Sequence, residues 1–123
     1  MNRGISPPTG FRYPRVRTEG ELMAEVLQVP EQSRFVVKVD GQEAGFLSYE
    51  AAGEQTWTLV STEVDPTYRG QGLAGQLVAD AVRVARTEGI RLRPLCPYTV
   101  SWFERHPQDQ DVLDPSWAPP TDD

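Results

Sequence analysis

The fold is decided by a glycine-containing turn, Val64-Asp65-Pro66-Thr67-Tyr68-Arg69-Gly70-Gln71-Gly72-Leu73-Ala74, which separates two segments of different periodicity. Residues 56–64, before the turn, are rich in residues that favour β-strands. Residues 73–88, after it, place apolar side chains at helical spacing. Pro66 ends the strand, because it has no amide hydrogen to continue strand pairing. The sequence therefore predicts a strand, a turn and an amphipathic helix in direct succession.

This turn has the composition of an anion-binding site. The first amides of a helix have no partner within the helix, and together with the helix dipole they favour negative charge. Gly70 and Gly72 allow the backbone to approach a phosphate without a Cβ clash. The turn lacks the Gly-Lys-Ser/Thr ending of a P-loop and only approaches the dinucleotide fingerprint. On these residues alone, a phosphate site and a plain strand-to-helix turn are equally supported.

Two further strand segments precede the turn. Residues 35–39 are rich in valine and are followed by Asp40-Gly41, a strong hairpin signal. Residues 44–49 have the pattern of the returning strand. With residues 56–64 these segments predict an antiparallel meander of strands. Residues 21–27 fit either an earlier strand or a short helix.

The segments after the first helix predict one more strand and one more helix. Gly89 is placed to end the first helix, and residues 91–95 form a short strand. Pro97 suits the first position of a second helix. That helix ends near Arg105, because Pro107 disfavours helical geometry in the residue before it. The expected fold is α+β (mixed α/β): an antiparallel strand meander followed by helix, strand and helix, with one crossover.

The chain of 123 residues has the length of a single domain. Residues 1–18 contain four arginines and no acidic residue, and residues 108–123 contain five aspartates and no basic residue. We therefore expect a poorly ordered basic arm or processed extension over residues 1–20, the folded domain over residues 21–113 and a poorly ordered acidic tail over residues 114–123.

Composition argues against several classes of function. The net charge is −6, and the acidic middle of the chain has no basic stripe, which disfavours nucleic-acid binding. There is no apolar run long enough to span a membrane and no secretory signal. The single cysteine, Cys96, and the single histidine, His106, exclude an intramolecular disulfide and disfavour a metal site. We expect a cytoplasmic protein without a metal or membrane partner.

Several spaced motifs resemble one family. The motif Arg69-x-x-Gly72-x-Ala74 is similar to the Arg/Gln-x-x-Gly-x-Gly/Ala motif with which GNAT acyltransferases bind the pyrophosphate of coenzyme A. A subgroup of small, single-domain GNAT proteins has four motifs that occur here in the same order, over about residues 30–113. These motifs are Thr62-Glu63-Val64-Asp65-Pro66, Tyr68-Arg69-Gly70-Gln71-Gly72-Leu73-Ala74, Leu95-Cys96-Pro97-Tyr98 and Arg105-His106-Pro107.

The resemblance implies a GNAT fold and acetyl-CoA as co-substrate. The main chain around Glu63 and Val64 would pair with the pantetheine arm, and the loop amides from Gln71 to Gly75 would hold the pyrophosphate. The implied cofactor-binding positions are Glu63, Val64, Arg69, Gly70, Gln71, Gly72, Leu73, Ala74 and Gly75. The implied reaction moves an acetyl group to an amine on a small molecule or peptide, which the sequence does not identify.

Cys96 is one catalytic candidate. As the residue before Pro97 it would be the N-cap of the second helix, where the helix dipole favours a thiolate. Such a thiolate could attack the acetyl thioester and form an acyl-enzyme, and in the small subgroup a cysteine here is a suggested catalytic residue. The alternative is a buried, inert cysteine. The subgroup usually has a histidine where this chain has Ser61, and His106 fits a helix-terminal surface position.

Glu63 is the second catalytic candidate, as the base for direct transfer of the acetyl group from acetyl-CoA to the amine. A solvated side chain at the strand end, without a catalytic role, is an equally supported interpretation of Glu63. Larger GNAT enzymes carry a tyrosine on the last helix that protonates the leaving thiolate, whereas this chain has Trp102 and Phe103 there. Tyr98 could replace that tyrosine or could be a packed aromatic residue. The weak catalytic apparatus leaves two other functions open: a CoA-binding module with little or no transferase activity, and an interaction protein that uses the basic arm.

Overall fold

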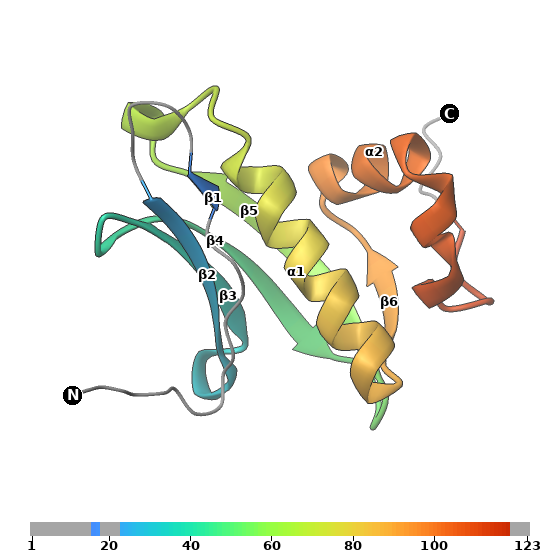
Figure 1. Ribbon diagram of the computed structural model, residues 1–123. Helices are drawn as coiled ribbons and strands as arrows, with labels where there is room; N and C mark the ends of the chain where they lie inside the picture. Colours follow the sequence, from blue (N-terminus) through green and yellow to red (C-terminus); the bar gives the residue numbers. More distant parts are fainter. Residues whose placement is uncertain (1–15, 18–22, 119–123) are drawn as a thin grey trace.

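The computed structural model describes residues 16–17 and 23–118, which form one six-stranded sheet with two helices (Figure 1). The strands are β1 (Val16–Arg17), β2 (Met23–Val29), β3 (Arg34–Val39), β4 (Gln42–Ala51), β5 (Thr56–Val64) and β6 (Arg91–Pro94), and they lie in this order across the sheet. The helices are α1 (Leu73–Glu88) and α2 (Pro97–Arg105), with short 3₁₀ helices at Pro30–Gln32, Pro66–Tyr68 and Pro107–Val112. All neighbouring strands are antiparallel except β5 and β6, which are parallel. The predicted α+β architecture is confirmed.

The element boundaries agree with the sequence pattern and settle one alternative. Of residues 21–27, which fitted a strand or a helix, the described residues 23–27 belong to strand β2. Helix α1 ends as expected at Gly89, which has φ 73° and donates its amide to Ala85 O. Helix α2 begins with Pro97 directly after Cys96. The two-residue strand β1 was not predicted, because two residues carry no periodic signal.

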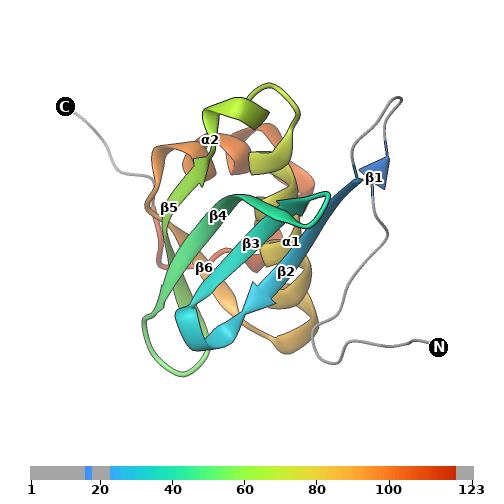
Figure 2. The same ribbon diagram turned by 90° about the vertical axis from the view of Figure 1, so that its left-hand side faces the viewer.

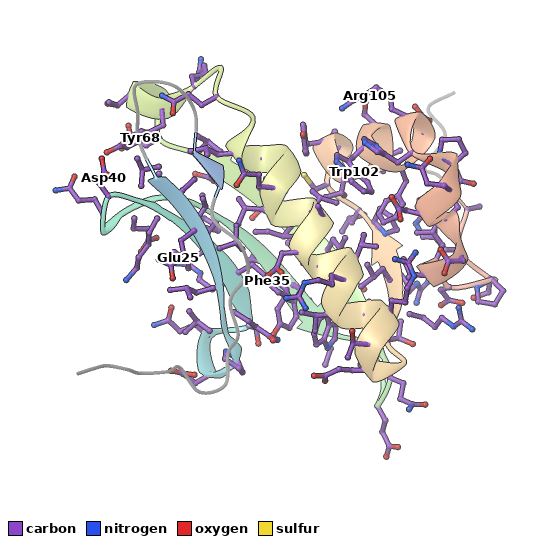
Figure 3. All side chains as sticks on the ribbon, viewed as in Figure 1. Glu25, Phe35, Asp40, Tyr68, Trp102 and Arg105 are labelled. Carbon is purple, nitrogen blue, oxygen red and sulfur yellow. The ribbon has the colours of Figure 1, made fainter. Side chains whose placement is uncertain are left out.

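Both helices lie on the same side of the sheet. Helix α1 buries its apolar stripe, including Leu77 and Ala81, in one core with Phe35 and Leu47 of the sheet. Phe35 is labelled in Figure 3. In Figure 2 the strands β2 to β4 lie in front and both helices lie behind them. Within the described residues, the opposite face of these strands therefore carries no helix, and we call it the helix-free face. Neither described helix is long and apolar enough to cross a bilayer.

The strands β4 and β5 approach each other closely at Gly45, which pairs with Val64. A Cβ atom on Gly45 would lie 2.5 Å from the carbonyl oxygen of Glu63 and 3.1 Å from the Cα of Val64. Only glycine fits this position. Further along the pair the register shifts: Ser48 lies opposite Ser61, but Tyr49 lies opposite Leu59. Strand β5 therefore has one extra residue here, which is a β-bulge.

The pairing of β5 with β6 ends early. The last pair is Leu59 with Pro94, and the amides of Leu95 and Cys96 both donate to Leu59 O, at 3.0 and 3.1 Å. The chain then turns away into α2. Within the described part of the chain, residues 60–64 of β5 have no strand partner on this side, and we call this stretch the open edge of β5.

The C-terminal segment follows β6. The amide of Asp114 donates to Leu92 O at 2.9 Å, and Trp117 Nε1 donates to Pro94 O at 2.9 Å. Two residues of the segment expected to begin a poorly ordered tail, Asp114 and Trp117, are therefore hydrogen-bonded to β6. The remainder of that tail, residues 119–123, and most of the expected basic arm over residues 1–20 lie outside the described residues.

We predict that Gly45→Ala lowers the free energy of unfolding by about 1–3 kcal/mol, because the new methyl group meets backbone atoms that cannot turn aside. Gly75→Ala is the matched control, since its Cβ would lie 3.4 Å from the nearest atom, Tyr98 Oη, and alanine favours a helix interior. Denaturant unfolding of both variants checks this. Equal stabilities would contradict the close approach of β4 and β5.

Candidate functional site

The open edge of β5 offers unpaired main-chain groups at Val64. The amide of Asp65 donates to Ala44 O of β4 at 2.7 Å, and the carbonyl of Glu63 also lies against β4, close to Gly45. Successive residues of a strand direct their amide and carbonyl groups to opposite edges. The main-chain groups of Val64 therefore face the open edge, and those of Glu63 do not.

The glycine turn lies directly beyond this edge. Gly70 and Gly72 have φ angles of 83° and 77°, in the left-handed region that favours glycine. A Cβ on either would meet no atom within 4 Å, so backbone conformation and not crowding requires glycine here. Gly72 is the N-cap of α1, and no side chain of the described residues caps this helix. Its first amides are thus available to an anion.

Leu73 and Asp65 fix the position of the turn. Leu73, the first residue of α1, is 3% exposed and anchors the helix start in the core. The Asp65 carboxylate accepts a hydrogen bond from the amide of Thr67 at 2.9 Å and caps the short 3₁₀ helix Pro66–Tyr68. The predicted anion-binding residues Arg69, Gly70 and Gln71 are exposed between these two anchors.

Two aromatic side chains of α2 line the start of α1. The ideal Cβ position of Gly75 lies 3.4 Å from Tyr98 Oη and 3.8 Å from Trp102 Nε1. Trp102, labelled in Figure 3, is buried and stacks on His106 with a centroid distance of 3.8 Å. The Tyr98 hydroxyl thus lies beside the predicted pyrophosphate loop. Phe103, within the stretch where larger GNAT enzymes carry a tyrosine, is buried in the core.

Cys96 lies where β5 and α2 diverge. It is the N-cap of α2, as expected, and it is 7% exposed. Its thiol donates to Thr62 Oγ1 at a sulfur–oxygen distance of 3.7 Å, and its amide donates to Leu59 O. The thiol is therefore in contact with the open edge of β5.

The structure does not bring the two catalytic candidates together. Thr62 lies opposite Leu47, which is buried under α1, so Thr62 and Cys96 are on the helix side of the sheet. Glu63 lies opposite Phe46 and is exposed on the helix-free face. The catalytic roles of Cys96 and Glu63 stay predictions.

His106 and Ser61 also lie apart. His106 stands at the end of α2 opposite to Cys96, where its Nδ1 lies 2.7 Å from Trp102 O. Ser61 lies on the helix-free face, with its Oγ 2.9 Å from Ser48 Oγ. Sequence reasoning missed this serine pair, because it depends on the strand register, although the alternation of β4 could have placed Ser48 on that face.

The described residues contain no group of three or more histidine, cysteine, aspartate or glutamate side chains that could hold a metal ion. The expectation of a metal-free site stays a prediction. Around the open edge and the glycine turn, the described residues offer main-chain amides, hydroxyl groups, one thiol and exposed carboxylates.

Comparison with known proteins gives a consistent result. The family described as GCN5-related N-acetyl-transferase matches residues 34–112. Protein NATD1 of Bos taurus is 31% identical over 78 residues, which are 63% of this chain and 69% of the relative. Among solved structures, Ard1 from Thermoplasma volcanium has a TM-score of 0.53 at 18% identity, covering 64% of this chain. N-acetylglutamate synthase from Neisseria gonorrhoeae, complexed with coenzyme A and N-acetyl-glutamate, has a TM-score of 0.50 at 24% identity, covering 60%.

The two structural matches establish the fold and extend over part of each protein. The chain spans 56% of the Thermoplasma protein and 18% of the Neisseria protein. The family match covers most of the described chain, from β3 to the 3₁₀ helix after α2. The family expected from the sequence is thereby confirmed. The chain belongs to the GCN5-related N-acetyltransferase family.

Proposed function

We propose that the chain transfers the acetyl group of acetyl-CoA to an amine on a small molecule or peptide. The main observation that supports this proposal is the open edge of β5. It is followed in the chain by the glycine turn and by the start of α1, which has no side-chain cap. Acetyl-CoA supplies an acetyl thioester: the amine nitrogen forms the new C–N bond, the C–S bond breaks, and coenzyme A leaves as the thiol while the nitrogen loses a proton.

The pyrophosphate would be held at the start of α1. The first amides of α1 have no side-chain cap, and the left-handed conformation of Gly72 turns the chain into the helix, so the amides from Gln71 to Gly75 would bind the phosphates. Arg69 would add a positive charge beside the phosphates. The side chain of Leu73 acts indirectly, because its burial holds the first turn of the helix in place.

The pantetheine arm would lie along the open edge of β5. An extended amide-containing chain can pair with an unpaired strand edge as an additional strand does. The orientation of the main chain favours Val64 over Glu63 for this pairing. Tyr98 and Trp102, beside the first turn of α1, would form the opposite wall of the channel and exclude water from the arm.

Cys96 would act as the nucleophile from the helix side. Its thiolate attacks the acetyl carbon, the bond to the coenzyme A sulfur breaks, and that sulfur takes up the proton released by Cys96. The acceptor amine then attacks the S-acetyl carbon, and the thiol of Cys96 is restored. On the alternative direct route, in which the amine attacks acetyl-CoA itself, Glu63 on the helix-free face would accept the ammonium proton of the acceptor through water.

A CoA-binding module with weak or no turnover is the second candidate function. Ser61 stands where the subgroup usually has a histidine, and the stretch of the last helix that carries a tyrosine in larger enzymes has Trp102 and Phe103 here. Steady turnover with any amine distinguishes the enzyme from this module. The cytoplasmic location and the lack of a nucleic-acid partner stay predictions from the sequence.

Gly72→Asp should abolish measurable CoA binding, because it adds a negative charge where the pyrophosphate would lie. A like charge at about 4 Å costs several kcal/mol even at an effective dielectric constant of about 20, so affinity should fall at least a hundredfold. Gly72→Asn is the matched control, since asparagine has the same shape, tolerates φ of 77° and carries no charge. Calorimetric titration with CoA compares the two. Equal affinities for both variants would refute the assignment of the phosphate site.

Incubation with acetyl-CoA should add one acetyl group to the intact protein, and Cys96→Ala should abolish the adduct. Thr62→Val is the control, because it removes the hydroxyl that the thiol contacts but keeps the thiol itself. Intact-protein mass spectrometry detects the adduct. An adduct that persists in Cys96→Ala, or tight CoA binding with no adduct in the native chain, would rule out the acyl-cysteine route.

A further inference from the structure

The segment that follows the 3₁₀ helix Pro107–Val112 runs along the outer edge of β6, the edge that faces away from β5. Leu113 forms a parallel bridge with Leu92, and the amide of Asp114 donates to Leu92 O at 2.9 Å. We call residues 113–117 the C-terminal strap. The family match ends at residue 112, so the strap lies outside it.

Trp117 of the C-terminal strap binds the last carbonyl group of β6. Leu92 O accepts from the strap, whereas the amide of Leu95 donates to Leu59 O of β5 at 3.0 Å. Main-chain groups alternate between the two edges of a strand, so Pro94 O faces the outer edge. Trp117 Nε1 donates to this oxygen at 2.9 Å. Pro94 is fully buried, so loss of the indole would cost its carbonyl a hydrogen bond that water does not readily replace.

One carboxylate shapes the turn that presents Trp117. Asp114 Oδ1 accepts from both the amide and the hydroxyl of Ser116, each at 2.9 Å, and the amide of Trp117 donates to Asp114 O at 2.9 Å. The hydrogen bonds from Ser116 hold the pKa of Asp114 below its usual value, and the charge of Arg93 has the same effect. Arg93 Nε of β6 lies 3.6 Å from Asp114 Oδ2. The same ionised side chain therefore closes the strap turn and pairs with β6.

The turn that carries the thiol directly follows Pro94, the last residue of β6. The amides of Leu95 and Cys96 both donate to Leu59 O, on the inner edge. The Leu95 side chain is 55% exposed, so it adds little packing to this turn. Hydrogen bonds thus hold three consecutive residues, from β5 on one side and from Trp117 on the other. The position of the Cys96 thiol at the open edge depends on this turn.

We propose that Trp117 is a positioning residue for the reaction: its hydrogen bond to Pro94 O fixes the turn of Leu95 and Cys96, and thereby the thiol at the open edge of β5. This inference rests on the proposed function, in which that thiol attacks the acetyl carbon. A displacement of about 1 Å at a reacting group can slow a reaction about a hundredfold. Trp117 therefore affects the rate of acetyl transfer more than the affinity for CoA, because the pyrophosphate would be bound at residues 71–75.

Trp117→Phe is the first test, because phenylalanine keeps an aromatic ring and removes the N–H donor. We expect amide hydrogen exchange at Leu95 and Cys96 to become about tenfold faster, with no change in β3. Asp111→Ala is the matched control: it breaks the pair of Arg86 Nη2 with Asp111 Oδ1, at 2.6 Å, and leaves Trp117 in place. Unchanged exchange in Trp117→Phe, or equal changes in both variants, would overturn the proposal.

The rate of acetyl transfer separates positioning of the thiol from mere anchoring of the strap. Intact-protein mass spectrometry gives the rate of acetyl-Cys96 formation over a range of acetyl-CoA concentrations. Trp117→Phe should lower the maximal rate about tenfold to a hundredfold and leave the half-saturating concentration unchanged. Partial unfolding would lower the amount of adduct but not its rate constant. An equal maximal rate in the variant and the native chain would contradict the proposal.

Alkylation by iodoacetamide probes the thiol without acetyl-CoA. The sulfur of Cys96 displaces iodide from the reagent and loses its proton to water, and in the native chain this residue is only 7% exposed. Trp117→Phe should accelerate the reaction, because a loosened turn exposes the sulfur. Equal alkylation rates in the variant and the native chain would count against the proposal.

Asp114→Ala is a second variant, and it keeps Trp117 itself. It removes the acceptor of both hydrogen bonds from Ser116, so it should open the strap turn and reproduce the faster exchange at Leu95 and Cys96. If denaturant unfolding shows that Trp117→Phe does not fold, this variant decides. Native exchange rates at both amides in Asp114→Ala would then refute the role of the strap.

These measurements distinguish failure of this inference from failure of the proposed function. If the native chain forms the acetyl adduct and Trp117→Phe forms it at the same rate, only the role of Trp117 is wrong. If the native chain does not bind CoA in a calorimetric titration, the proposed function fails. Exchange and alkylation then still decide whether Trp117 positions the thiol.

Discussion

The site depends on the early end of pairing between β5 and β6. One carbonyl, Leu59 O, accepts hydrogen bonds from the amides of both Leu95 and Cys96, so β6 cannot continue alongside β5. Pro97 reinforces this end, because it has no amide hydrogen to donate and it suits the first position of a helix. The same turn thus leaves a strand edge unpaired and places a thiol beside it. A regular parallel pair would have neither feature.

The close contact at Gly45 is the second constraint, because it holds the far end of β5 against β4. With that end fixed, the unpaired main-chain groups of Val64 lie between the thiol of Cys96 and the glycine turn before α1. Burial of Leu73 fixes the start of α1 on the other side of the turn. The open edge is therefore held in place at both ends, by the contact of β4 with β5 and by the buried start of α1.

The sequence predicted the elements that local signals define and missed those that depend on long-range register. Gly89 and the Cys96-Pro97 pair fixed the ends of the helices, because capping chemistry acts within a few residues. The segment of residues 21–27 was ambiguous, since its mixture of residues suits a strand or a helix, and the pairing of β2 with β3 decides for the strand. The serine pair of Ser48 and Ser61 and the anchor of Trp117 on β6 join distant segments, so neither left a local signal.

The central claim is that CoA binds along the open edge of β5 and at the start of α1. Amide hydrogen exchange, measured residue by residue with and without CoA, tests it most directly, because a bound ligand slows the exchange of the amides it contacts. The account predicts slower exchange at Val64 and at residues 71–75, with no change in β3. Protection confined to the helix-free face, or no protection at Val64 and residues 71–75 with CoA in saturating excess, would contradict it.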